Sequence, residues 1–177
     1  MNIAILRLGH RLVRDYRTTT HVALVARAFG CSKLYMTDID DSIKSTLVDV
    51  NNRWGYNKFN FEIELITNWK NILKRWKEKG GTVLHLTMYG INIDDVIPAI
   101  KKNIDQILIV IGAEKVPSEV YRISDYNIAV SNQPHSEIAA LAITLDRIFE
   151  GKQLKFDFKS AKMKIIPSST GKSIEKI

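Results

Sequence analysis

The stretch that decides the fold runs from Ile107 to Phe149 and reads ILIVIGAEKVPSEVYRISDYNIAVSNQPHSEIAALAITLDRIF. Its first five residues, 107–111, form an unbroken apolar and mostly β-branched run, which is typical of a strand buried on both faces. The run stops at Gly112, and a polar turn that ends at Pro117 follows. Residues 127–130 then predict a second short strand of the same sheet.

A polar loop, residues 131–135, connects this second strand to a helix that we predict to begin at Ser136. Serine is a favoured N-cap residue, and Glu137 places a negative charge at the positive end of the helix dipole. Apolar residues then recur at helical spacing as far as Phe149. Two loops therefore leave the ends of two buried strands, and one of them runs into a helix N-terminus. Open α/β sheets bind their ligands at such loops.

The rest of the chain alternates between strand-like and helix-like segments. Apolar runs predict strands at residues 2–6, 33–36 and 82–86, and alternating apolar and acidic residues predict an edge strand at 61–66. Capping residues and helical spacing predict helices from residues 18–20 to 29, from 40 or 41 to 54, from 68 to 79, and from 94 or 95. This order indicates an α/β fold, in which a mostly parallel sheet carries helices on both faces.

The composition fits one domain, since the chain has 177 residues of which 45% are hydrophobic. We expect this domain to span residues 1–150 and a basic C-terminal extension to span residues 151–177. The apolar N-terminal run is too short for a signal peptide, and no run approaches the roughly 20 residues of a membrane span, so no membrane association is expected. A single cysteine, Cys31, excludes an internal disulfide and indicates a reducing cytoplasm.

The net charge of +7 favours a polyanionic partner over a merely basic surface. The strongest local signal lies in residues 7–17, which carry four arginines and one histidine and which we expect to form a loop leaving the end of the first strand. The planar guanidinium group of arginine matches phosphate oxygens well. The alternative is a solvated loop whose charge is balanced by Asp15. The candidates for binding a nucleic-acid backbone are Arg7, His10, Arg11, Arg14 and Arg17.

Several other residues have two open interpretations. Glu114 is either a solvated turn residue or a ligand for a ribose hydroxyl or a cation. The loop 131–135 either binds a ligand or only caps the helix after it. His85 lies within an apolar run, so we expect it in the core, as we do Trp69 and Trp76. Four scattered histidines and one cysteine make a poor ligand set, and no metal site is expected.

Four segments taken together resemble SPOUT methyltransferases. Residues 110–117, VIGAEKVP, are similar to the second motif of that family, a glycine and a glutamate at a strand end. Residues 131–140 resemble its third motif, a loop that runs into a helix. Residues 7–22 and 85–90 narrow the resemblance to the archaeal tRNA (cytidine(56)-2′-O)-methyltransferases. The resemblance covers residues 2–150.

This resemblance implies both a fold and a reaction. It implies a deep trefoil knot in the C-terminal part of the sheet, and a homodimer that shares its substrate site across the interface. The implied reaction transfers a methyl group from S-adenosylmethionine to the ribose 2′-hydroxyl of cytidine 56 in tRNA. Three loops would hold S-adenosylmethionine. Their residues are Leu86, Thr87, Met88, Tyr89, Gly90, Gly112, Ala113, Glu114, Lys115, Val116, Val130, Ser131, Asn132, Gln133, Pro134, His135, Ser136 and Glu137.

The catalytic residue does not transfer with the resemblance, because the arginine that is common in SPOUT 2′-O-methyltransferases falls at Leu24. On electrostatic grounds the catalytic candidates are Arg17, Arg14 and Arg11, and His21 is a further candidate for accepting a proton. Two other functions stay open at this point. One is a non-catalytic, basic RNA-binding module, and the other is a small-molecule enzyme of the doubly wound class.

Overall fold

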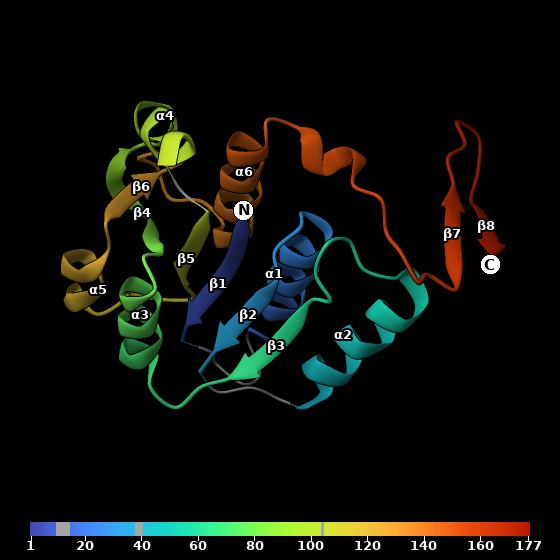
Figure 1. Ribbon diagram of the computed structural model, residues 1–177, viewed down its shortest axis with the longest axis horizontal. Helices are drawn as coiled ribbons and strands as arrows, with labels where there is room; N and C mark the ends of the chain where they lie inside the picture. Colours follow the sequence, from blue (N-terminus) through green and yellow to red (C-terminus); the bar gives the residue numbers. More distant parts are fainter. Residues whose placement is uncertain (10–14, 38–40, 104) are drawn as a thin grey trace.

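Six strands form the central sheet in the computed structural model, which describes residues 1–9, 15–37, 41–103 and 105–177 (Figure 1). The strands are β1 (Asn2–Leu8), β2 (Lys33–Met36), β3 (Glu62–Leu65), β4 (Thr82–Asn92), β5 (Gln106–Gly112) and β6 (Tyr126–Ala129). Their order is β3-β2-β1-β5-β4-β6, and all the neighbouring strands pair in parallel. This confirms the predicted α/β fold and the edge position of β3.

Within these described residues, six α-helices follow the strands along the chain. They are α1 (Tyr16–Ala28), α2 (Asp41–Trp54), α3 (Trp69–Glu78), α4 (Ile93–Asn103), α5 (Ser118–Ile123) and α6 (Glu137–Phe149). Two of the predicted N-caps are confirmed, because the side chain of Asn68 accepts from the N–H of Lys70 and that of Ser136 accepts from the N–H of Ile138. Gly30 follows α1 with a φ of +89°, as a glycine that ends a helix often does.

The two faces of the sheet have separate apolar cores, because side chains alternate between faces along each strand. On β1, Ile3 and Ile5 belong to the core under α1, α2, α4 and α6, whereas Ala4 and Leu6 belong to the core under α3 and α5. β5 alternates in the same way. Figure 1 shows α3 and α5 lying together over the half of the sheet that contains β4 and β5. β2 and β3 therefore have a full helical cover on one face only.

Three elements differ from their predictions. α1 begins at Tyr16 rather than at residues 18–20, and Thr20 instead donates to the carbonyl of Tyr16 from within the helix. β4 continues to Asn92 instead of ending at Leu86, because its far end pairs again with β6. The short helix α5 was not predicted. It has only six residues, and no side chain caps its N-terminus.

The C-terminal extension also contains regular secondary structure. A 3-10 helix, η1 (Lys152–Lys155), is followed by the antiparallel strands β7 (Met163–Ile166) and β8 (Ser173–Lys176), which pair only with each other. This hairpin stands beyond α2 at one end of the molecule (Figure 1). Before it, Tyr56 and Lys159 exchange two backbone hydrogen bonds, which fasten the extension to the end of α2.

Candidate active site

The two loops that the sequence singled out line one cavity with the segment 86–89. The cavity has a volume of about 660 Å³ and lies at the carboxyl ends of β4, β5 and β6. Its lining is His85, Leu86, Thr87, Met88, Tyr89, Ile111, Gly112, Ala113, Glu114, Lys115, Val116, Ser118, Tyr121, Ile128, Val130, Pro134, His135, Glu137 and Ala140. The volume lies within the usual range for small-molecule sites, about 300–1,000 Å³.

The first wall of the cavity is an irregularity inside β4. Leu86 and Ile91 both pair with Ile128 of β6, so the residues between them are pushed out of the sheet. The hydroxyl of Thr87 shares a hydrogen bond with that of Tyr121, at 2.9 Å, and accepts from the N–H of Tyr89. The bulged segment is thus held by its own polar groups while its side chains face the cavity.

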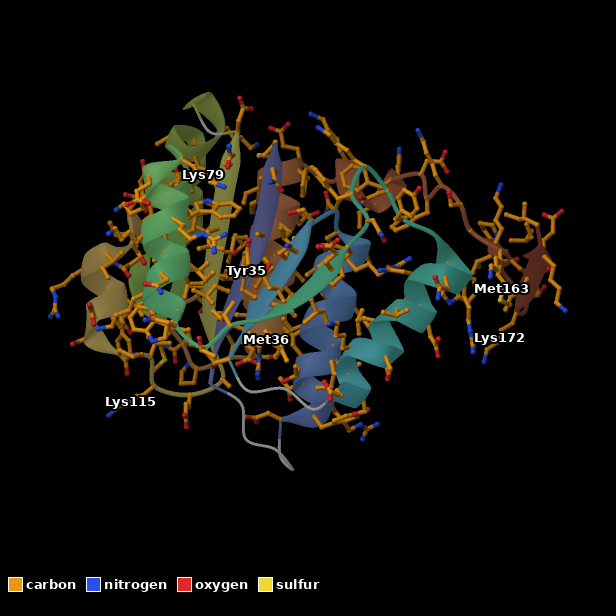
Figure 2. The ribbon with its side chains drawn as sticks, turned by 60° about the horizontal axis from the view of Figure 1, so that its bottom comes forward. Tyr35, Met36, Lys79, Lys115, Met163 and Lys172 are labelled. Atoms are coloured by element: carbon orange, nitrogen blue, oxygen red, sulfur yellow. The ribbon has the colours of Figure 1, made fainter. Side chains whose placement is uncertain are left out.

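The second wall is the turn after β5, which needs glycine for a steric reason. A Cβ at Gly112 would lie 2.4 Å from Cγ1 of Val116 and 2.8 Å from the carbonyl oxygen of Glu114. The turn's own atoms therefore exclude a side chain at this position. Ala113 ties the turn to β1 by donating to the carbonyl of Leu8. Lys115 projects away from the body of the molecule (Figure 2).

The third wall, residues 130–137, is fastened to the first. The side-chain amide of Asn132 donates to the carbonyls of Met88 and Gly90, at 2.7 and 3.2 Å. Gly90 itself lies against β6, since a Cβ there would come within 2.5 Å of the carbonyl oxygen of Asn127. These contacts join two segments that are more than forty residues apart in the chain.

Arg7 requires a correction. We expected it in a phosphate-binding loop, but it lies on β1, is fully buried, and donates from Nε and Nη2 to Oε1 of Glu137. Its Nη1 donates to the carbonyl of Gly9 at 3.0 Å. Each of the three guanidinium nitrogens donates within the protein, and the side chain is fully buried, so a phosphate in solution cannot reach it. Arg7 instead sets the position of Glu137 at the rim of the cavity.

His85 was predicted as a core residue, and it is buried, with 1% of its surface exposed, yet it also lines the cavity. Asn127 donates from its amide to the carbonyl of Tyr121, which leaves its oxygen to accept from Nδ1 of His85 at 2.8 Å. Burial lowers the pKa of His85, while the bond to Asn127 opposes this shift. A neutral imidazole with its proton on Nδ1 presents Nε2 as an acceptor. Sequence analysis also missed Tyr121, whose ring packs edge-on against His85 at 4.6 Å.

Most of the residues expected to bind a ligand do line the cavity, and the others have structural contacts instead. Thirteen lie in its lining: Leu86, Thr87, Met88, Tyr89, Gly112, Ala113, Glu114, Lys115, Val116, Val130, Pro134, His135 and Glu137. Gly90, Ser131, Asn132, Gln133 and Ser136 do not. Gly90 packs on β6, Asn132 joins two walls, and Ser131 accepts from the N–H of Gln133. Ser136 caps α6.

Of the expected catalytic residues, the two that the structure describes, Arg17 and His21, are not part of this lining. Arg17 and His21 lie on the exposed side of α1, four residues apart, and so face the same way. Neither lines the cavity of its own chain. His10, Arg11 and Arg14 lie outside the described residues. The part of the chain that is described holds no group of three or more His, Cys, Asp or Glu side chains suited to a metal ion. Nor does it contain a helix long and apolar enough to cross a membrane.

Comparison with known protein sequences points to one family. Residues 54–175 match the family described as tRNA ribose 2′-O-methyltransferase, aTrm56. A Thermococcus kodakarensis protein named tRNA (cytidine(56)-2′-O)-methyltransferase is 55% identical over 176 residues, which are 97% of this chain and 96% of that protein. A Nitrosopumilus maritimus protein of the same name is 53% identical over 175 residues, which are 99% and 97% of the two chains.

Solved structures share the fold at low sequence identity. The A. aeolicus TrmH/SpoU tRNA modifying enzyme superposes with a TM-score of 0.63 at 17% identity, covering 87% of this chain and 77% of that one. The SpoU methyltransferase AviRb from Streptomyces viridochromogenes, solved in complex with the cofactor AdoMet, gives a TM-score of 0.60 at 15% identity, covering 85% and 58% of the two chains. These likenesses support the α/β architecture.

Proposed function

Because the chain belongs to the tRNA ribose 2′-O-methyltransferase family (aTrm56), we propose that it methylates the ribose 2′-hydroxyl of cytidine 56 in tRNA. Relatives at about 50% identity over nearly the whole chain are named for this reaction. The cavity is the structural observation that supports the proposal, because residues of all three loops expected to hold a methyl donor line it together. A non-catalytic RNA-binding module has no comparable support.

We assign the cavity to S-adenosylmethionine, which supplies an electrophilic methyl group on a sulfonium. Its floor is apolar at Leu86, Ile111 and Ile128, and its rim carries backbone groups of the loops after β5 and β6. An apolar floor suits an adenine ring, and exposed loop amides and carbonyls suit its polar edge. Glu114, which lines the cavity, is assigned to the ribose hydroxyls of the donor.

The chain's own contribution to the reaction is to align the ribose oxygen and to assist loss of its proton. Alignment alone contributes on the order of 7–11 kcal/mol in ideal geometry. A guanidinium beside the hydroxyl stabilises the alkoxide as it forms, but arginine, with a pKa above about 12, is a poor base. We therefore assign Arg17 to the phosphate beside the target ribose and His21 to proton acceptance. His10, Arg11 and Arg14 stay candidates from the sequence.

Since Arg17 and His21 do not line the cavity of their own chain, we propose that they serve the cavity of a second copy in a homodimer. Mixing two inactive variants tests this arrangement. Arg17→Ala removes the cation, and Gly112→Val blocks the turn. Neither variant should transfer methyl groups alone, and a mixture should regain activity in the hybrid dimers. If the mixture stays inactive while light scattering shows exchange of subunits, Arg17 does not act across an interface.

We also infer that the C-terminal part of the chain forms a trefoil knot. The support is the contact of the loop after β6 with the bulged segment of β4, made by Asn132 and by the close packing of Gly90. Pulling the protein from both ends provides a test. An unknotted chain extends by about 3.3–3.6 Å per residue, and a tightened knot shortens that length. Full extension of all 177 residues would contradict the knot.

The main proposal is tested by incubating the purified protein with an unmodified tRNA transcript and S-adenosylmethionine, then mapping fragments by mass. We expect one added methyl group on the ribose of cytidine 56. The matched control is a tRNA with 2′-deoxycytidine at that position, which offers no hydroxyl and should gain nothing. Methylation of another nucleotide, or of the control, would overturn the proposed specificity.

We also propose that the protein is cytoplasmic. A tRNA substrate and the free, buried Cys31 agree with this location.

A further inference from the structure

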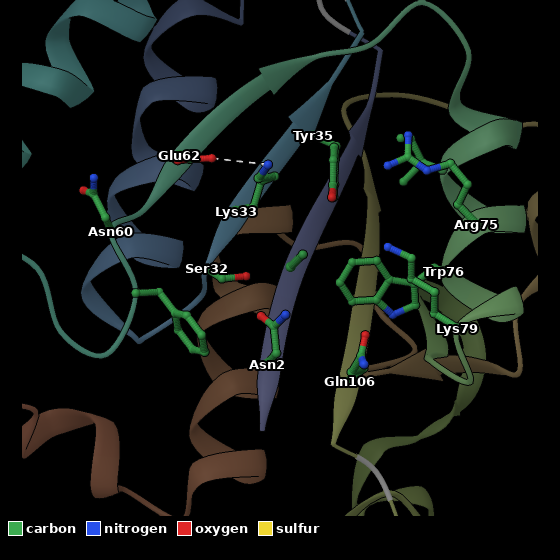
Figure 3. A pocket seen from close by; sticks show the side chains of 13 residues that line it. Asn2, Ser32, Lys33, Tyr35, Asn60, Glu62, Arg75, Trp76, Lys79 and Gln106 are labelled. Carbon is green, nitrogen blue, oxygen red and sulfur yellow. Dashed lines mark ion pairs between the residues drawn. The ribbon is translucent and has the colours of Figure 1, made fainter.

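A second cavity, of about 510 Å³, shares no lining residue with the proposed methyl-donor site. Figure 3 shows it from close by. It sits beside α3 at the amino ends of β1, β2 and β5. Its lining is Asn2, Ala4, Ser32, Lys33, Tyr35, Phe59, Asn60, Glu62, Ile72, Arg75, Trp76, Lys79 and Gln106. β1 spans six residue steps from Asn2 to Leu8, about 20 Å at 3.3 Å per step, so the two cavities lie at opposite ends of the sheet.

The cavity exists because one face of the sheet is only partly covered. The core under α3 and α5 includes side chains from β1, β4 and β5, but only Tyr35 from β2 and none from β3. Beyond α3 this face therefore continues as an open floor. Figure 3 shows Tyr35 and Trp76 facing each other across it, with Lys33 and Glu62 on one side and Arg75 and Lys79 on the other.

The floor combines aromatic rings with hydrogen-bonding groups. Tyr35 and Trp76 meet edge to face at 6.5 Å. Around them stand a third aromatic ring, three amides and a hydroxyl, from Phe59, Asn2, Asn60, Gln106 and Ser32. Among the described residues, neither Oδ1 of Asn2 nor Nε1 of Trp76 has a hydrogen-bond partner, although both atoms are buried. Buried polar groups are rarely left in this state. Nε1 of Trp76 lies against Gly81, since a Cβ there would come within 2.4 Å of it, so the polar groups offered to a ligand are the other side chains of the lining.

The charge of the rim is positive on the side of α3. Lys33 is already paired with Glu62 and Glu64, at 3.3 and 2.9 Å. Arg75 and Lys79, by contrast, form no ion pair within the described part of the chain, and both line the cavity. They are four residues apart, so they stand on the same side of the helical segment. Two free cations beside an aromatic floor are suited to an anion attached to a flat ring.

We propose that this cavity binds a single nucleotide, with its base against Tyr35 and Trp76 and its phosphate on Arg75 and Lys79. Aromatic side chains stack on bases of any sequence, and amides such as those of Asn2 and Gln106 bind base edges. Guanidinium and ammonium groups bind phosphate. A purely apolar ligand would leave these groups unpaired, and a bare phosphate would leave the aromatic floor unused.

The nucleotide comes from one of two sources. One is an unpaired nucleotide of the tRNA substrate, and this source rests on the proposed function, because the same molecule must also reach the methyl-donor site. The other is a free mononucleotide. We favour the tRNA, since the net charge of +7 attracts a long polyanion more strongly than a small one. A folded tRNA is also long enough to contact both ends of the sheet.

The test compares two variants that each lose two positive charges. Arg75→Gln/Lys79→Gln removes the rim cations, and Lys44→Gln/Lys74→Gln removes exposed cations from α2 and α3 outside the cavity. NMR of the Trp76 indole N–H reports on the cavity directly while 5′-mononucleotides or tRNA are added. We expect both ligands to shift this signal in the control variant and to lose their effect in the rim variant.

Affinity for tRNA at several salt concentrations separates the two sources. The salt slope of the rim variant should fall by about one for each lost phosphate contact, and the control should fall less. If mononucleotides shift the Trp76 signal but both variants bind tRNA equally, the ligand is a free nucleotide and the RNA source is wrong. If neither ligand shifts the signal, the proposal as a whole is wrong. None of these readouts requires methyl transfer, so a failure of the proposed function would be seen separately.

Discussion

The guanidinium of Arg7 holds one carboxylate oxygen of Glu137 twice, with Nε–Oε1 and Nη2–Oε1 distances of 3.0 and 2.8 Å. The two residues are 130 positions apart, and their contact fixes the N-terminal end of α6 to the end of β1. Arg7 is completely buried, whereas the side chain of Glu137 keeps 16% of its surface exposed. Removing the cation would therefore leave a largely buried carboxylate at the rim of the proposed methyl-donor cavity without its partner.

We expect Arg7→Met to lower the free energy of unfolding by about 3 kcal/mol, which is at the lower end of the effect of breaking a buried ion pair. Urea denaturation measures this change. Glu137→Gln keeps the shape of the side chain and one acceptor oxygen, so it should cost less. In a double-mutant cycle the two changes should be non-additive, since each removes the same contact. Additive effects, or a loss below about 0.5 kcal/mol for Arg7→Met, would show that the pair contributes little.

Gly112 is a point at which one added methyl group should disturb the proposed methyl-donor site. In Gly112→Ala the new Cβ would overlap Val116 and the carbonyl of Glu114, so the turn after β5 must open. We expect the affinity for S-adenosylhomocysteine, measured by calorimetry, to fall by at least about tenfold, which corresponds to 1.4 kcal/mol. Gly171→Ala is the matched control, because its Cβ meets nothing within 4 Å. Equal affinities for the two variants would mean that this turn does not bind the donor.

His85 should make the protein less stable in mild acid. Its folded pKa is lowered by burial, whereas the unfolded chain has the ordinary value near 6.5. Below that value the unfolded chain takes up a proton that the folded protein does not. The free energy of unfolding therefore decreases as the pH is lowered, and this residue contributes at most about 1.4 kcal/mol per pH unit. Urea midpoints measured from pH 7.5 to 5.5 should show this loss.

The same series with His85→Gln should be flatter over that range of pH. His135→Gln changes an exposed histidine and should keep the slope of the unaltered protein. A wild-type slope that survives the His85→Gln substitution would place the proton uptake on another group. Chemical shifts of the imidazole resonances would then identify which residue titrates.

Local signals in the sequence were enough to predict the sheet and two loops of the proposed methyl-donor cavity, those after β5 and β6, whereas the third loop came from the resemblance to SPOUT methyltransferases. Lys33–Met36 and Asp41–Trp54 have the predicted bounds, and Asn68 and Ser136 cap the helices that they were expected to cap. These features depend on residues a few positions apart. The gathering of loops at one edge followed from parallel strands ending on the same side.

The features that could not be predicted from the sequence depend on contacts between residues that are far apart in the chain. Arg7 was read as part of a basic loop, because Glu137, which pairs with it, is 130 residues away. The second part of β4 required β6 beside it, and no local pattern indicates that pairing. His85 is buried in the core and also lines the cavity. The apolar run around it predicted only the first of these, because nothing in that run indicates that the ring faces a cavity.

The boundary expected after residue 150 can be tested by comparing two shortened chains. The segment 151–161 packs on the domain. Phe156 meets Phe149 edge-on at 5.3 Å, Phe158 lies under the guanidinium of Arg27, and Gln153 donates to Asp146. Ending the chain at residue 150 removes these side chains, and the loss of one large core side chain typically costs about 3–5 kcal/mol. We expect that chain to be destabilised by at least the lower of these values.

A chain that ends at residue 161 keeps the same contacts and loses the hairpin of β7 and β8, which pairs with no strand of the central sheet. This shortened chain also loses contacts with α2, among them the hydrogen bond from the backbone N–H of Lys162 to the carbonyl of Arg53. Since a change of 1 kcal/mol shifts Tm by about 2–4 °C in a chain of this size, its Tm should stay within a few degrees of the full-length value. Equal Tm values for the two shortened chains would place the boundary at residue 150. A large loss in the longer one would show that the hairpin belongs to the folding unit.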